Sequence, residues 1–132
     1  MVSLYVRDLH STEAIGLMAS HPRLWLTPLH QAEWAHAVER QVFHKVLSRR
    51  EAREVHVQFE KDRADGVWVD ASLPELALEV CAQLARRHAA RLGTRTLDTL
   101  HVASALELKA KRFWTFDERQ ARLARAAGLR LK

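Results

Sequence analysis

Cysteine, glycine and proline are all scarce in this chain of 132 residues, and each scarcity excludes a class of protein. The single cysteine, Cys81, cannot form an internal disulfide, so we expect a folded protein of a reducing compartment, the cytoplasm. Four glycines and three prolines leave little room for linkers or low-complexity segments. No apolar run approaches the roughly 18 residues that a membrane span needs. The length therefore predicts one domain, residues 1–132.

Two common motifs are also missing, one that binds nucleotides and one that binds DNA. The sequence has no glycine-rich phosphate loop, which argues against a nucleotide hydrolase of the P-loop kind. It has no helix-turn-helix pattern, which argues against one common class of sequence-specific DNA-binding protein.

Acidic residues are scarce in one part of the chain. Residues 1–85 carry 9 Lys or Arg and 12 Asp or Glu, whereas residues 86–132 carry 12 and 4. A basic segment of this kind suggests an anionic partner such as nucleic acid, although a solubilising surface of arginines would look the same. The four acids of the basic segment stand out against this background: Asp98, Glu107, Asp117 and Glu118.

Short apolar segments alternate with amphipathic ones along the whole chain. This alternation predicts an α/β fold with a mostly parallel central sheet. Tryptophans in the predicted strands are expected in the core, whereas Trp34 is expected at a protein-binding surface. We expect strands at residues 24–26, 67–69, 113–116 and 129–131, and helices at 12–20, 28–44, 49 onward, 72–88, 97–108 and 118–127.

Three acids are predicted where strands end and helices begin. Asp117 directly follows the strand at 113–116, Glu33 lies in the second turn of the helix after 24–26, and Asp98 lies in the first turn of its helix. In parallel sheets, functional clefts lie beyond the carboxyl ends of the strands. Each acid could instead simply complement a helix dipole.

Together, the three acids suggest a metal site. Clustered carboxylates repel one another unless a cation neutralises them, and hard oxygen ligands suit Mg²⁺ or Mn²⁺. Such ions can activate water and stabilise the leaving oxygen of a phosphodiester. Nearby groups could bind the substrate, namely the side chains of Arg95, Arg112, Thr115 and Arg119.

Two C-terminal segments resemble PIN-domain ribonucleases, and most closely the VapC-type toxins of bacterial toxin–antitoxin pairs. They are RTLDTLHVASA at residues 95–105 and FWTFDERQ at residues 113–120, followed by Gly128-Leu129. A third segment, TPLHQAEW at residues 27–34, is similar to the one that carries this family's helical glutamate. The resemblance implies a three-layer α/β/α sandwich and metal-dependent cleavage of structured RNA such as tRNA or rRNA. It also implies a homodimer, a small antitoxin partner, and Glu33, Asp98 and Asp117 as metal ligands and catalytic residues.

The N-terminus departs from the family pattern, which begins with a strand ending in an Asp-x-Ser motif. In one interpretation, residues 1–14 correspond to the helix and loop that follow that strand, so the strand and its aspartate lie upstream of Met1 or are lost from a degenerate copy. In the other, residues 2–6 are the strand and Asp8 is its terminal acid, since Val2, Tyr5 and Val6 favour strands. We prefer the first because DLHSTEA, residues 8–14, is similar to the family's loop.

Two functions follow from these interpretations. One is an active Mg²⁺- or Mn²⁺-dependent endoribonuclease. The other is a catalytically impaired module that binds antitoxin or RNA without cleaving, since losing one carboxylate from a shared site weakens metal binding.

Overall fold

The computed structural model of the protein describes residues 1–20 and 22–131. The chain divides into two compact units, residues 1–72 and 73–132, and each is described by itself. The expectation of one domain therefore stays a prediction. The first unit contains a 3₁₀ helix (Val2–Leu4), α1 (Ser11–Met18), β1 (Leu24–Leu26), α2 (Pro28–Phe43), α3 (Arg49–Ala64) and β2 (Trp68–Asp70); the second contains α4 (Ala77–Leu92), α5 (Thr96–Glu107) and α6 (Glu118–Ala126).

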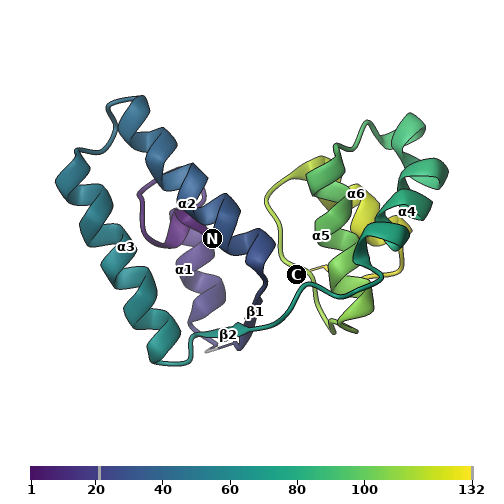
Figure 1. The fold of residues 1–132 in the computed structure, drawn as a ribbon, viewed down its shortest axis with the longest axis horizontal. Helices are drawn as coiled ribbons and strands as arrows, with labels where there is room; N and C mark the ends of the chain where they lie inside the picture. The colour runs from purple at the N-terminus through teal and green to yellow at the C-terminus, as the bar shows by residue number, and fades with distance from the viewer. Residues whose placement is uncertain (21, 132) are drawn as a thin grey trace. The chain divides into compact units, whose positions relative to one another are not determined.

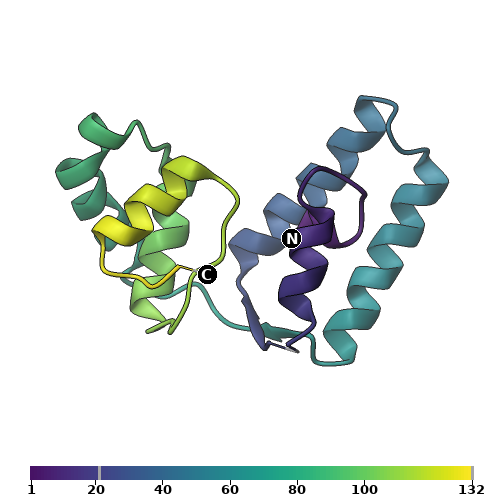
Figure 2. The same ribbon diagram turned by 180° about the vertical axis from the view of Figure 1, so that it is seen from behind.

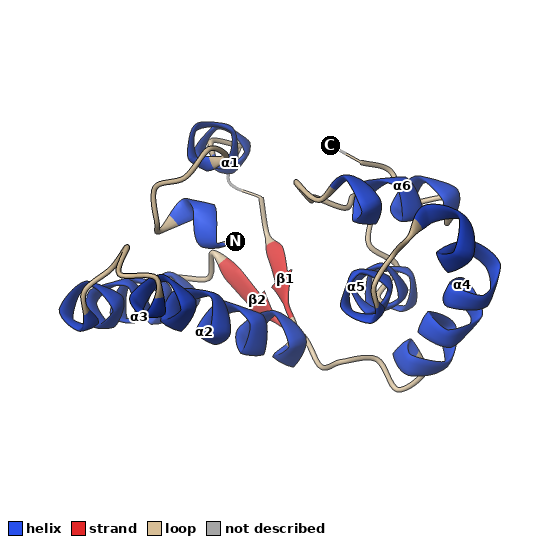
Figure 3. Ribbon diagram, turned by 90° about the horizontal axis from the view of Figure 1, so that it is seen from above, coloured by secondary structure: helices blue, strands red, loops and turns tan. Residues whose placement is uncertain are grey.

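The first unit pairs a short parallel sheet with a helical hairpin. Leu24 lies opposite Trp68 in a parallel register, and Leu26 opposite Asp70 (Figure 3). The helices α2 and α3 run side by side after β1 (Figure 1), and each also packs against one of the two strands. Parallel strands need a crossover connection, which α2 and α3 provide here. The parallel pairing confirms the predicted class, an α/β fold.

Both helices of this hairpin begin at the residues that the sequence predicts. Thr27 precedes Pro28 at the N-cap of α2, and the ring of His30 accepts a hydrogen bond of 3.2 Å from the Thr27 amide. Ser48 caps α3, where its hydroxyl accepts from the Glu51 amide and the Glu51 carboxylate accepts from the Ser48 amide. Such capping boxes satisfy amides that the helix leaves unpaired.

An aromatic cluster forms the core of the first unit. Phe59 and Trp34 stack with ring centroids 4.5 Å apart, and the edge of Tyr5 meets Trp34 at 4.9 Å. The indole N–H of Trp68 donates to the Tyr5 hydroxyl (2.8 Å), which in turn donates to Asp62 (2.7 Å). Burial and the bond to Asp62 raise the pKa of Tyr5.

The tryptophan predictions are partly wrong. Trp34 is 3% exposed and belongs to the core rather than to a protein-binding surface, because its ring fills the space between α2 and α3. Trp25 is 42% exposed, because alternate residues of a strand point to opposite faces and Trp25 lies between the two inward neighbours of β1. Trp68 is buried, as predicted.

The N-terminal segment is a 3₁₀ turn, not a strand. Residues Val2–Leu4 form the turn, so the interpretation that makes Asp8 the acid at the end of a strand is wrong. The Asp8 carboxylate instead closes a local turn by accepting from the Ser3 hydroxyl (2.8 Å), the His10 amide (2.8 Å) and the Ser11 hydroxyl (3.2 Å). Partial burial opposes ionisation, but these bonds outweigh it and lower the pKa of Asp8. The helix expected at 12–20 is α1, which begins one residue earlier, at Ser11, and has His10 as its N-cap.

Three helices that pack against one another make up the second unit (Figure 2). Its core is formed by small and aliphatic side chains, with Val102, Ala103 and Leu123 fully buried. Cys81 is 6% exposed and belongs to this core. Because α5 is buried on several sides, its first turn is held firmly, and that turn carries Asp98.

The strands predicted at 113–116 and 129–131 are wrong. A single parallel bridge joins Phe113 to Leu131, with a hydrogen bond of 2.8 Å from the Phe113 amide to the Arg130 carbonyl. Beyond it, the Thr115 hydroxyl accepts from the Asp117 amide at 3.1 Å, which bends the chain into a turn before α6. A threonine hydroxyl that bonds to a nearby backbone amide competes with the hydrogen bonds that a β-sheet would form.

Two helix boundaries also differ from the prediction. The helix expected at 72–88 is α4, which begins after a turn from Pro74 to Ala77 and continues to Leu92. It ends at Gly93, whose φ of 64° is the left-handed conformation typical of a glycine C-cap. In α5 the N-cap is Arg95 rather than Thr96.

Within the part of the chain that the structure describes, no helix is both long and apolar enough to cross a membrane.

We expect Phe59→Ala to lower the free energy of unfolding by about 3–5 kcal/mol, because the ring is 1% exposed and its loss leaves a cavity. The control Val57→Ala lies on the same helix, is 70% exposed and should change stability by less than about 0.5 kcal/mol. Urea unfolding followed by circular dichroism measures both, with Phe59→Leu as an intermediate variant. Equal effects of Phe59→Ala and Val57→Ala would contradict the assignment of the core.

Candidate metal centre

The first turn of α5 fixes the side chain of Asp98. Its Oδ2 atom accepts from the backbone amide of Arg95 at 3.0 Å, three residues earlier, which satisfies an amide at the helix start. The same carboxylate forms a two-pronged ion pair with the Arg95 guanidinium, at 3.0 Å from Nε and 3.2 Å from Nη2. The Asp98 side chain is only 8% exposed, so this geometry is largely shielded from water.

Asp117 is the N-cap residue of α6, and backbone amides of that helix fix its side chain. One carboxylate oxygen, Oδ1, accepts from the amides of Arg119 (2.8 Å) and Gln120 (3.0 Å). The other oxygen, Oδ2, is left to face Arg95. A capping aspartate normally satisfies backbone amides and complements the helix dipole, and Asp117 does both. The structural role of Asp117 therefore leaves one of its two oxygens for another partner.

Arg95 joins the two carboxylates. Its Nη2 atom lies 3.2 Å from Oδ1 of Asp98 and 3.5 Å from Oδ2 of Asp117. A single positively charged nitrogen therefore contacts oxygens of both acids. The guanidinium of Arg95 is therefore a cation that both acids contact.

The charge around Asp98 favours its ionised form. Burial raises the pKa of this carboxyl, but the hydrogen bonds from the Arg95 side chain and amide, with the positive charges of Arg95 and Arg119, outweigh burial and lower the pKa below its usual value. Asp98 is thus a carboxylate at neutral pH, which is the state that a metal ligand needs.

Glu33 lies in the second turn of α2, in the first unit, and is partly buried. Among residues 1–20 and 22–131, no group of three or more His, Cys, Asp or Glu side chains is arranged to hold a metal ion. The structure brings together Asp98 and Asp117, and the role of Glu33 as a third ligand stays a prediction.

The residues predicted to bind substrate have varied surroundings. Arg112 and Arg119 are exposed, and the Arg119 amide donates a hydrogen bond to the Asp117 carboxylate. The hydroxyl of Thr115 is engaged by the Asp117 amide, so it positions the acid. Arg95 is held by the two acids. Their roles in binding substrate stay predictions.

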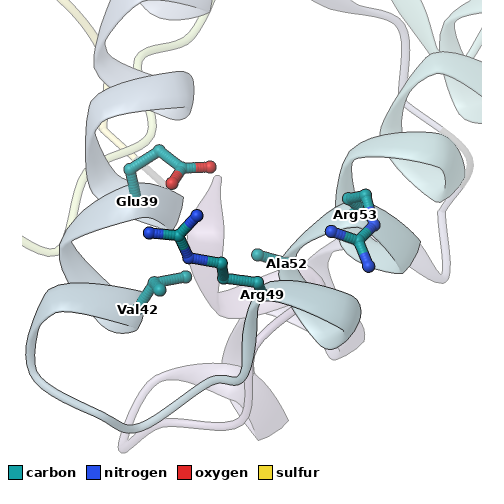
Figure 4. A pocket seen from close by; sticks show the side chains of 5 residues that line it. All are labelled: Glu39, Val42, Arg49, Ala52 and Arg53. Atoms are coloured by element: carbon teal, nitrogen blue, oxygen red, sulfur yellow. The ribbon is translucent and has the colours of Figure 1, made fainter.

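Two surface hollows lie outside this cluster. One, of about 300 Å³, lies between α2 and α3 and is lined by Glu39 and Val42 on one side and by Arg49, Ala52 and Arg53 on the other (Figure 4). The second, of about 420 Å³, is lined by residues of the 3₁₀ turn, of α3 and of the loop before it. Neither is lined by any of the predicted site residues.

The sequence predicts Arg95 as a substrate contact, whereas in the structure Arg95 bridges two acids. One of these two contacts, with Asp98, has a local sequence pattern that could have predicted it. Arg95 and Asp98 are three residues apart, which is the spacing at which an acid in the first helical turn reaches back to the N-cap residue. Its contact to Asp117 joins residues 22 positions apart and has no such local signal.

We expect Asp117→Ala to lower the free energy of unfolding by about 1 kcal/mol, because α6 loses both hydrogen bonds at its cap. Asp117→Asn keeps an oxygen acceptor and should cost only a few tenths, on the order of 0.3 kcal/mol. Glu118→Ala is the control, since the Glu118 side chain is 91% exposed. Urea unfolding measures all three, and equal losses for Asp117→Ala and Asp117→Asn would show that charge rather than capping stabilises α6.

A family model described as PIN domain matches residues 1–126, which includes all three predicted acids. No curated protein and no solved structure matches the chain. PIN domains have an α/β fold and are generally nucleases that act on nucleic acid with divalent metal ions. The chain belongs to the PIN domain family.

Proposed function

We propose that this protein is a Mg²⁺- or Mn²⁺-dependent endoribonuclease, a VapC-like toxin that cleaves structured cellular RNA such as tRNA or rRNA in the cytoplasm. The observation that carries the proposal is the pair Asp98 and Asp117, whose carboxylates contact one cationic nitrogen of Arg95. The PIN family match over residues 1–126 supports the nuclease chemistry.

The donor atoms of this pair fit a hard divalent cation. Each acid offers a carboxylate oxygen, the ligand type that Mg²⁺ and Mn²⁺ prefer, and Mg²⁺ commonly needs only one or two carboxylates besides water and substrate phosphate. In this proposal Asp98 and Asp117 hold the ion, and Glu33 is the predicted third acid. When bound, the ion would activate water for attack on the phosphodiester and stabilise the leaving oxygen.

The surrounding residues orient the pair and attract the substrate. The amides of Arg119 and Gln120 fix one oxygen of Asp117, so that the other oxygen points away from the helix start. Arg119 and Arg112 are exposed, and their guanidinium groups can each donate two hydrogen bonds to a phosphate. The 12 Lys or Arg of residues 86–132, against 4 acids, attract the RNA backbone over a longer range.

A second function is favoured by one observation. Residues Val2–Leu4 form a 3₁₀ turn, and Asp8 is engaged in a local turn, so neither supplies the strand and acid with which PIN domains usually begin. A site with fewer carboxylates binds metal more weakly. In this alternative the protein is a catalytically impaired module that binds an antitoxin or RNA without cleaving it.

The proposed partners rest on the family resemblance. A small antitoxin protein and a second copy of the chain in a homodimer are proposed with the toxin role. Size-exclusion chromatography with light scattering measures the dimer directly.

Cleavage of labelled structured RNA tests the proposed reaction. We expect the purified protein to cleave a pool of folded tRNA when MnCl₂ or MgCl₂ is present and to stop when EDTA removes the ion. Asp98→Asn and Asp117→Asn should each reduce the rate by about tenfold or more, since even losing a partner of a metal ligand costs that much. Glu118→Gln, next to Asp117 and exposed, is the matched control and should retain the wild-type rate.

The same variants separate the two functions. If the wild-type protein cleaves no RNA in either metal yet binds it in a gel-shift assay, and neither Asp98→Asn nor Asp117→Asn changes that binding, the impaired module is the correct function. Cleavage that is insensitive to both substitutions would place the activity elsewhere or in a contaminant.

A further inference from the structure

We propose that Arg95 is a built-in counter-ion that competes with the divalent cation for Asp98 and Asp117. The Arg95 guanidinium contacts both carboxylates, and a metal ion would bind them by displacing it. This inference rests on the proposed metal site and adds to it a step in which one cation replaces another.

The contacts of Arg95 cover the atoms that a metal would need. Both oxygens of Asp98 accept from this one residue: Oδ2 from the amide and Nε at 3.0 Å each, and Oδ1 from Nη2 at 3.2 Å. The remaining oxygen of Asp117, Oδ2, accepts from the same Nη2 at 3.5 Å. Arg95 therefore occupies carboxylate oxygens of both acids that would hold a metal ion.

Exposure identifies which member of the cluster can move. The Arg95 side chain is 64% exposed, against 8% for Asp98 and 34% for Asp117. Arginine has a long, flexible stem, so its guanidinium can rotate into water at little cost of desolvation. Asp98 is fixed by the Arg95 amide, and Asp117 by the amides of Arg119 and Gln120. The carboxylates therefore stay in place while the guanidinium leaves.

The competition follows from the charges. The two carboxylates carry two negative charges, and Arg95 neutralises one of them. A guanidinium at the site also repels an incoming divalent ion. Removing the charge of Arg95 should therefore strengthen metal binding. If Arg95 instead positioned Asp98 for the metal, removing it would weaken binding, so the two roles predict opposite signs.

Manganese titration of four proteins measures whether loss of the Arg95 charge strengthens or weakens metal binding. Free Mn²⁺ is followed by electron paramagnetic resonance as MnCl₂ is added to the wild-type chain, Arg95→Gln, Arg95→Lys and the control Arg91→Gln. Arg91 lies in the last turn of α4, is exposed and has the same charge, so its loss changes the net charge equally. We expect Arg95→Gln to bind Mn²⁺ about tenfold more tightly than the wild type, since a nearby positive charge no longer opposes the ion. Arg91→Gln should match the wild type, and Arg95→Lys should lie between the wild type and Arg95→Gln.

Thermal unfolding provides a second readout that needs no catalysis. Without metal, Arg95→Gln should melt at a lower temperature than Arg91→Gln, because the two carboxylates then repel each other unscreened. Added MnCl₂ should raise the melting temperature of Arg95→Gln more than that of the wild type, because a ligand stabilises the folded state according to its affinity.

The outcomes separate this inference from the proposed function. Binding of Mn²⁺ by the wild type that Asp98→Asn abolishes, with equal or weaker binding by Arg95→Gln, overturns the counter-ion role and leaves the metal site intact. Absence of Mn²⁺ binding in both the wild type and Arg95→Gln overturns the metal site and the counter-ion role together. If Arg95→Gln does not fold, Arg95→Lys decides, since tighter binding than the wild type supports the competition and equal or weaker binding overturns it.

Discussion

Two carboxylates lie side by side at this site because a positive charge lies between them. Asp98 is almost fully buried, and Asp117 is held by the start of a helix, so neither can turn away from the other at no cost. Without a cation, two neighbouring carboxylates repel each other. The guanidinium of Arg95 removes that repulsion, and the pKa of Asp98 is lowered instead. A cation between the two acids therefore stabilises this arrangement, and the Arg95 guanidinium is that cation in the structure.

The packing of the second unit supports this pair. Val102 and Ala103 are fully buried and anchor α5, and Leu123 does the same for α6. The two helices pack against each other, and the N-cap residue of α5, Arg95, contacts the N-cap residue of α6, Asp117. In the first unit, the aromatic cluster around Phe59 and Trp34 holds α2, the helix that carries Glu33. The hydrophobic residues thus determine where the acids lie, and the acids determine what the protein can bind.

Much of this arrangement could be predicted from local patterns. The capping residues Thr27, Ser48 and Asp117 begin the predicted helices, and the segment Leu24–Leu26 is a strand, because caps and apolar runs depend on neighbours in the sequence. Strands at 113–116 and 129–131 were wrong because a ladder depends on partners far along the chain, whereas the turn at Thr115 depends only on Asp117. The contact of Arg95 with Asp117 could not be predicted for the same reason. Glu33 lies in the first unit and the other two acids lie in the second. Local sequence patterns do not predict contacts between residues so far apart along the chain.

The proposed function depends above all on a divalent cation that binds Asp98 and Asp117. Paramagnetic broadening of the protein's amide signals by small amounts of Mn²⁺ tests this binding most directly, because the broadening falls steeply with distance from the ion. We predict that the amides of Asp98, Arg119 and Gln120 broaden first, while those around Phe59 stay sharp. Broadening that begins at other acidic residues, or that spreads evenly over the chain, would contradict it.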